Sequence, residues 1–183
     1  MLWPFSHFRK PPLTPRGTIE AIYGMIVTQA REPIFYRDLA VPDTVNGRFD
    51  LLLLHLWLLL RRLRTAAEGP ELSQALFDRF CEDMDDNLRE MGIGDQVVPK
   101  RMRAFGEAFY GRTKAYDQAL EEGGEALALA ICKNILNGAH IAQAKRLAAY
   151  ARDVESTLGR ADEAALREAT FEFPSPIREE MAP

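Results

Sequence analysis

The sequence of 183 residues suits one domain with a single hydrophobic core, since 47% of its residues are hydrophobic and a chain of this size buries most of its apolar surface. The net charge is only −4, and acidic and basic residues are interleaved along the chain. The sequence has no long run of basic residues of the kind that binds nucleic acid, so we expect no nucleic acid as a specific ligand.

The first segment, residues 1–13, has no regular apolar period. Its sequence MLWPFSHFRKPPL combines aromatic and basic residues, which is typical of a weak interfacial anchor on an anionic membrane and also of a packed or disordered arm. It lacks the apolar core and the small-residue cleavage site of a secretory signal. Together with two isolated cysteines, Cys81 and Cys132, this predicts a cytoplasmic protein with reduced thiols.

The predicted helical domain covers residues 14–170 and begins with an amphipathic helix. Over residues 19–30, apolar side chains recur at the three- and four-residue spacing of one helix face, and a proline follows the pattern. The next segment, 31–48, holds two prolines and an Asn-Gly pair. This composition predicts an ordered series of turns, with one short helical turn at 33–37.

The most apolar stretch of the chain is LLLLHLWLLL, residues 51–60. A bilayer span needs roughly 20 apolar residues, whereas this run is closed by Asp50 on one side and by arginines on the other. Its leucines point in several directions around a helix, unlike those of an amphipathic surface helix. We therefore predict a central helix at about 48–65 that is buried on most sides, with His55 as a hydrogen-bonded core residue rather than a metal or haem ligand.

Further helices are expected after the central one. One starts near Pro70 and ends before Gly92, with apolar residues along one face. A long helix follows from about Pro99, and its interior glycines predict close backbone packing or a small bend. Two more helices end at glycines, a short one starts near Ala161, and 171–183 is predicted to be a flexible tail. With no strand pattern, the fold class is all-α, a single-domain bundle of about six to seven helices.

A cluster of carboxylates in DRFCEDMDDNLRE, residues 78–90, raises the alternative of an enzyme. Glu82, Asp83 and Asp86 imitate the spacing with which helical prenyl-transferring enzymes hold magnesium and diphosphate. The sequence has no second motif of this kind, and several acidic residues of this segment lie opposite the apolar face of the helix, which favours a solvated, salt-bridged surface. A P-loop, a nucleophile elbow, a dinucleotide-binding loop and a Glu-x-x-His pair are also missing from the sequence, so we predict no catalytic set, no metal site and no cofactor.

Four short motifs between Tyr23 and Leu120 are informative in combination. They are QAREPIFY at 29–36, PDTVNGRFD at 42–50, LREMGIGD at 88–95 and FYGR at 109–112. Together they resemble the ubiquinol-cytochrome c chaperone family.

The resemblance implies a non-catalytic assembly chaperone for the cytochrome bc1 complex, ubiquinol-cytochrome c reductase. Mitochondrial relatives of this kind act with a small partner protein, receive newly made cytochrome b near the ribosomal exit tunnel, and hold it until it joins the other subunits. For this chain the resemblance implies cytochrome b as the client, with a small assembly factor and the ribosome as further partners. We expect a cytoplasmic protein without a transmembrane segment, in peripheral contact with the inner face of the energy-transducing membrane. A metal-dependent helical enzyme and a helical adaptor for another protein are the alternatives.

The motifs of the resemblance also supply candidate residues for client or partner contact. Arg48 and Asp50 lie where the turn-rich segment enters the central helix, and Asp95 is placed to cap the next turn of chain. Each can serve folding, as a cap or a buried ion pair, or can touch the client directly. We expect a modest groove with an apolar floor and a charged rim, with the segment 35–48 in its wall. The candidates are Phe35, Tyr36, Asp43, Arg48, Asp50, Arg89, Glu90, Asp95, Tyr110 and Arg112.

Overall fold

The computed structural model describes residues 16–176, which form eight helices and no strand. The all-α class predicted from the sequence is therefore confirmed. The predicted N-terminal arm, 1–13, and the end of the predicted tail, 177–183, lie outside the described residues. The helices are α1 (Arg16–Ala30), α2 (Pro33–Arg37), α3 (Val45–Leu63), α4 (Gly69–Glu90), α5 (Val98–Glu122), α6 (Ala126–Asn134), α7 (Ile141–Arg160) and α8 (Glu163–Glu168).

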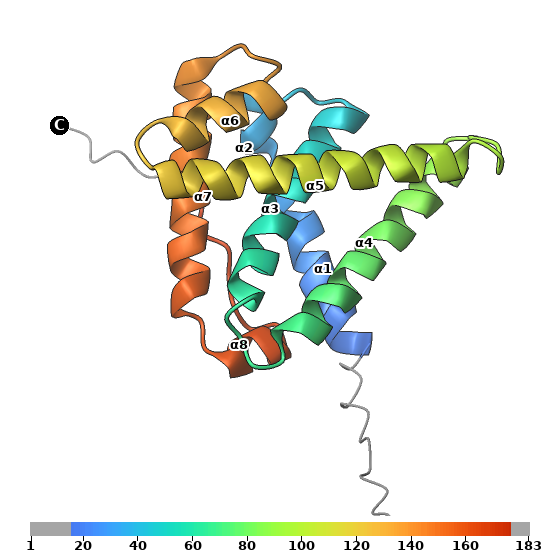
Figure 1. Cartoon of the computed structure of the whole chain (residues 1–183), viewed down its shortest axis with the longest axis horizontal. Coiled ribbons are helices and arrows are strands. Elements are labelled where there is room, and N and C mark those ends of the chain that lie inside the picture. Colours follow the sequence, from blue (N-terminus) through green and yellow to red (C-terminus); the bar gives the residue numbers. More distant parts are fainter. Residues whose placement is uncertain (1–15, 177–183) are drawn as a thin grey trace, which may run out of the picture.

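Helix α3 is the centre of the bundle. Figure 1 shows it between α7 on one side and α1 with α4 on the other, with α5 crossing in front. Every residue of α3 from Leu51 to Leu59 is buried, because α1, α4, α5 and α7 all contact this helix. The prediction of a leucine-rich central helix buried on most sides is confirmed.

The first turn of α3 is held against the segment that precedes it. Thr44 caps the helix, since its hydroxyl oxygen accepts a hydrogen bond from the backbone N–H of Gly47 at 3.2 Å. A Cβ atom at Gly47 would lie 2.0 Å from the carbonyl oxygen of Pro42, so only glycine allows this close approach. The cap starts the helix at Val45, a few residues before the predicted boundary.

A hydrogen-bonded chain crosses the buried centre at His55. Its Nδ1 lies 2.7 Å from the carbonyl oxygen of Leu51, which only accepts, so Nδ1 carries the proton. Its Nε2 therefore accepts from the Tyr150 hydroxyl at 2.8 Å, and that hydroxyl accepts from the amide of Gln29 at 3.0 Å. Burial lowers the pKa of His55 to about 4, so the ring is neutral near pH 7. The prediction of a hydrogen-bonded core histidine is confirmed.

The chain after α8 is packed where the sequence predicts a flexible tail. Phe171 is only 5% exposed, and the ring of Phe173 meets that of His55 edge to face with centroids 5.4 Å apart. The carbonyl oxygen of Pro174 accepts a hydrogen bond from Gln29 at 3.4 Å. Phe171 and Phe173 therefore pack on the bundle, because aromatic side chains gain more by this packing than by staying in water.

The structure narrows one local prediction for α5 and contradicts another. Cβ atoms at Gly106 and Gly111 would meet nothing within 4 Å, so close backbone packing, one of the two alternatives for these glycines, is absent inside the described chain. Helix α5 starts at Val98 without a side-chain cap. Asp95, the predicted cap, pairs with Arg89 instead, because a guanidinium offers several strong donors to a carboxylate.

Candidate functional site

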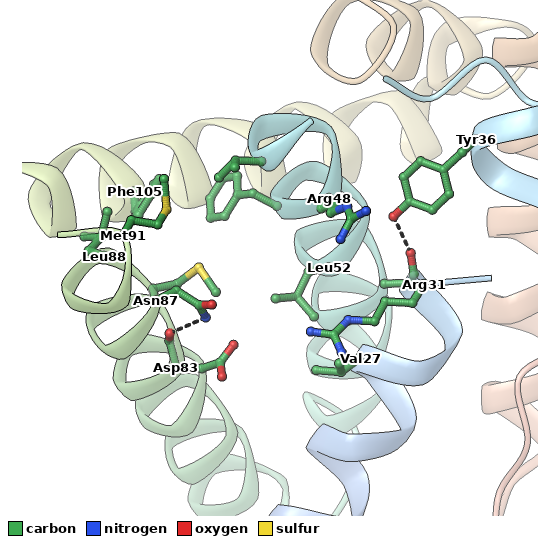
Figure 2. Close-up of a pocket in the computed structure, with 14 residues that line it drawn as sticks. Val27, Arg31, Tyr36, Arg48, Leu52, Asp83, Asn87, Leu88, Met91 and Phe105 are labelled. Atoms are coloured by element: carbon green, nitrogen blue, oxygen red, sulfur yellow. Dashed lines mark hydrogen bonds between the residues drawn. The ribbon is translucent and has the colours of Figure 1, made fainter. Parts of the chain in front are cut away.

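An apolar cleft of about 320 Å³ opens between α4 on one side and α1 with the first half of α3 on the other (Figure 2). Met91 and Val45 lie at this cleft with 57% and 59% of their surface exposed. Large apolar side chains that stay open to solvent are typical of a binding surface. The apolar lining residues are Val27, Ala30, Val45, Phe49, Leu52, Met84, Leu88, Met91 and Phe105.

A cluster of side chains beside the cleft holds α1 and α4 together. The Tyr23 hydroxyl donates to Asp83 at 3.0 Å, while Arg79 pairs with Glu20 at 3.0 Å and lies over the Tyr23 ring, 4.9 Å from its centroid. Figure 1 shows the two helices crossing and then separating toward the end of α4. The space between the separating helices is the cleft.

Helix α5 closes the back of the cleft. The rings of Phe49 on α3 and Phe105 on α5 are stacked with centroids 4.8 Å apart. Behind them, Arg112 lies over the Phe49 ring at 5.6 Å and brings its Nη1 to 2.9 Å from Oδ1 of Asp50. The cleft therefore has an aromatic back wall that is tied to the central helix.

Asp50 is a buried structural residue behind the cleft. It is 6% exposed, and burial raises its pKa to about 7 although Arg112 acts in the opposite direction. Arg112 is close enough for an ion pair, but its geometry is not that of an aligned hydrogen bond. Both residues hold α5 on α3, which is the folding role considered for Asp50, and Asp50 does not face the cleft opening.

The turn-rich segment supplies one end of the cleft. Tyr36 and Arg48 both line it, as the sequence predicts for the segment 35–48. The Tyr36 hydroxyl donates to the carbonyl oxygen of Ala30 at 2.8 Å, which fixes α2 on the end of α1. Arg48 pairs with Asp43 through Nε at 2.8 Å, and both side chains are largely exposed. Three of the candidate residues thus meet at this end.

Phe35 is a core residue, not a surface contact. It has no exposed surface, and its ring meets those of His55 and Tyr150 with centroids 5.5 Å and 5.2 Å apart. The sequence did not separate Phe35 from its neighbour Tyr36, because burial within a single helical turn is decided by the residues that pack against that turn.

The remaining candidates lie away from the cleft opening. Arg89 pairs with Asp85 at 2.6 Å and with Asp95, at the corner between α4 and α5. Glu90 is exposed at the same corner. Tyr110 lies on α5, 65% exposed, beside the ring of Phe77 with centroids 6.2 Å apart. The ten candidates therefore do not form one site.

Sequence reasoning missed the cleft residues on α1 and α4. Val27 and Met84 belong to apolar stripes that predict core packing, and both indeed touch the core. Met91 gave a signal, because it extends the apolar stripe of α4 and belongs to the motif LREMGIGD, and it is 57% exposed in the structure. Arg31 belongs to the motif QAREPIFY, but it was not selected as a contact candidate, and Asn87 carried no signal of its own.

The carboxylate cluster of α4 is not gathered around a common point. Asp83 accepts a hydrogen bond from Tyr23, while Glu82 and Asp86 are exposed. Within residues 16–176, no group of three His, Cys, Asp or Glu side chains is placed to hold a metal ion. Across the same residues, none of the helices has the length and apolar character needed to cross a membrane.

The fold and the cleft define a helical bundle with an open apolar surface between two diverging helices. The chain belongs to the ubiquinol-cytochrome C chaperone family, whose family model matches residues 37–173. The resemblance carried by the four motifs is therefore confirmed. The matched range includes α3, α4 and α5, which form most of the cleft.

Known relatives agree with this assignment. The chain is 29% identical over 104 residues to ubiquinol-cytochrome-c reductase complex assembly factor 1 of Xenopus laevis, covering 56% of this chain and 52% of the relative. It is 30% identical over 108 residues to the mitochondrial protein CBP3 of Saccharomyces cerevisiae, covering 57% and 32%. The chain thus spans about half or less of the length of these relatives.

One solved structure matches almost end to end. The crystal structure of the Cbp3 homolog from Brucella abortus superposes with a TM-score of 0.79 at 36% sequence identity, covering 87% of this chain and 90% of that chain. The bundle described here is therefore the family fold.

Proposed function

We propose that this chain is a non-catalytic assembly chaperone for the ubiquinol-cytochrome c reductase complex, with newly made cytochrome b as its client. The observation that carries the proposal is the match of the family model to residues 37–173. It is supported by the names of the relatives from Xenopus laevis and Drosophila melanogaster, both called assembly factors of this complex. A small partner factor, the ribosome and peripheral contact with the inner face of the energy-transducing membrane belong to the same proposal.

The cleft supports a holding role rather than permanent binding. Burying one leucine-sized side chain is worth roughly 1.5 to 3 kcal/mol, and a cleft of about 320 Å³ takes only a few such side chains. Association itself costs about 4 kcal/mol or more, so the net affinity of one cleft is modest. A chaperone needs this reversibility, because its client must leave for the assembling complex. The flexible thioether of Met91 suits contact with varied apolar surfaces.

The proposal is tested in a strain that lacks this chain. Cytochrome b and the assembled complex should both fall, while other respiratory complexes persist. A normal level of the complex, in a strain without a redundant relative, would contradict the proposal and favour an adaptor for another protein.

Complementation then tests the cleft. Met91→Glu places a charge at the cleft and should restore the complex only weakly, because an apolar client would have to desolvate the carboxylate. Leu129→Glu is the matched control, since Leu129 on α6 is also 57% exposed and does not line the cleft. It should restore the complex fully, and both variants should fold, because both positions are open to solvent.

A further inference from the structure

The end of the cleft formed by α2 and the start of α3 carries a concentration of positive charge. Arg31, Tyr36 and Arg48 line both the cleft and an adjoining hollow of about 290 Å³. That hollow adds Arg37 and Asp43 to its lining. Three arginines and one aspartate line this hollow, and a second aspartate, Asp38, lies 4.0 Å from Arg37, so positive charge is in excess there. This arrangement favours an anion.

The arginines are only partly neutralised. Arg48 is paired with Asp43 at 2.8 Å, but their side chains are 60% and 59% exposed, so the pair is weak. Arg37 has a contact of 4.0 Å with the adjacent aspartate and is 72% exposed. Arg31 forms no ion pair with any residue of the range 16–176. Figure 2 shows the Arg31 side chain extending along the wall into the cleft.

The acid on the opposite wall is already engaged. Asp83 accepts the hydrogen bond of Tyr23 at 3.0 Å, and Asn87 donates to the backbone carbonyl of Asp83 at 2.6 Å. The cleft is therefore asymmetric. Its middle is apolar, the polar groups of its α4 wall are already hydrogen-bonded within the protein, and its other end is basic.

We infer that the cleft binds a client segment whose apolar side chains are followed by a carboxylate, and that this carboxylate is held by Arg31, Arg37 and Arg48. The inference rests on the proposed function and names the chemistry of the segment that is bound. A wholly apolar segment would displace water from Arg31 without replacing its hydrogen bonds. A carboxylate accepts two parallel N–H bonds from a guanidinium. A segment that carries a carboxylate therefore replaces the hydrogen bonds that Arg31 loses when the segment covers it.

The shape of the site favours a peptide over a lipid surface. The arginines surround a hollow at the end of a cleft between helices, where an apolar helix or strand can lie lengthwise. A membrane surface would be met by basic residues on one outward face. Arg48, which lines this hollow, lies in the first turn of α3, near the positive end of the helix dipole.

The test uses the full chain and two fluorescent peptides, read by anisotropy. Both peptides are the same short leucine-alanine helix, ending in two glutamates in one and in two glutamines in the other. The glutamate peptide should bind roughly three- to tenfold more tightly, and added salt should reduce this preference. The double variant R31Q/R37Q should lose the preference while binding the glutamine peptide as before. Arg160→Gln controls for the loss of a surface positive charge away from the cleft and should keep the preference, since the hydrogen bonds of Arg160 within the described residues go to Ser156 and Thr157 of its own helix.

Several results would overturn the inference. Equal binding of the two peptides by the wild type, binding of neither, or a preference that survives in R31Q/R37Q would each do so. Loss of flotation with phosphatidylserine vesicles in R31Q/R37Q, with equal binding of both peptides, would assign the basic end to lipid instead. If both peptides bind equally while the deletion strain still lacks the complex, the proposed function stands and only this inference fails.

Discussion

Replacing Asp50 with asparagine should flatten the dependence of the stability of this protein on pH. The Asp50 side chain is 8% exposed, and burial raises its pKa from 3.8 to about 7. Between these two values the folded protein keeps a proton that the unfolded chain has released. The contribution of Asp50 to stability is therefore fully present below about pH 4 and is lost as the pH rises through about 7.

The size of this effect follows from the shift. About three pKa units correspond to about 4 kcal/mol, of which more than half falls between about pH 5 and pH 8. This is a large part of a typical unfolding free energy of about 5 to 15 kcal/mol. Chemical denaturation followed by circular dichroism, at about pH 5 and pH 8 for wild type and Asp50→Asn, measures it. The wild type should lose about 2 to 3 kcal/mol relative to the variant on going to the higher pH.

A second variant checks the role of the partner. Arg112→Met removes the guanidinium that favours the ionised form of Asp50, so the loss of stability should continue to higher pH than in the wild type. Parallel pH profiles for the wild type and Asp50→Asn would refute the reasoning, because they would mean that Asp50 titrates alike in the folded and unfolded chain.

Three further changes probe the core and the backbone. Leu56→Asp should unfold the protein, since Leu56 has no exposed surface and an unpaired buried carboxylate costs several kcal/mol; a thermal melt like that of Leu56→Met would contradict this. Tyr150→Phe should lower the unfolding free energy by about 1 to 2 kcal/mol, because Nε2 of His55 loses its donor at 2.8 Å, and unchanged denaturation curves would contradict a stabilising hydrogen bond between the two side chains. Gly47→Ala should destabilise, because the new Cβ would stand 2.0 Å from a carbonyl oxygen, whereas Gly111→Ala, with nothing within 4 Å, should stabilise by up to about 1 kcal/mol; melting temperatures that shift in the same direction would contradict the contrast.

Patterns within single helices were enough to predict much of the fold. The spacing of apolar residues over 19–30 and around Pro70 to Gly92 predicts α1 and α4, and the run at 51–60 predicts the buried central helix. The isolation of His55 among leucines predicts a core histidine, as found. These features depend on residues close in sequence or on burial alone. Both can be recognised in a single sequence, from the spacing of its apolar residues and from its apolar runs.

The sequence by itself thus determined the helical class, the central helix and, through four motifs, the family. Only the tertiary structure decided that Phe35 is covered, that Phe171 packs on the bundle, and that Arg31 and Met91 face one cleft. The positions of these residues depend on the angle at which α1 and α4 cross, and so on side chains about 60 residues apart such as Tyr23 and Asp83. A periodic pattern shows which face of a helix is apolar, but not whether a neighbouring helix covers all of that face or leaves part of it open.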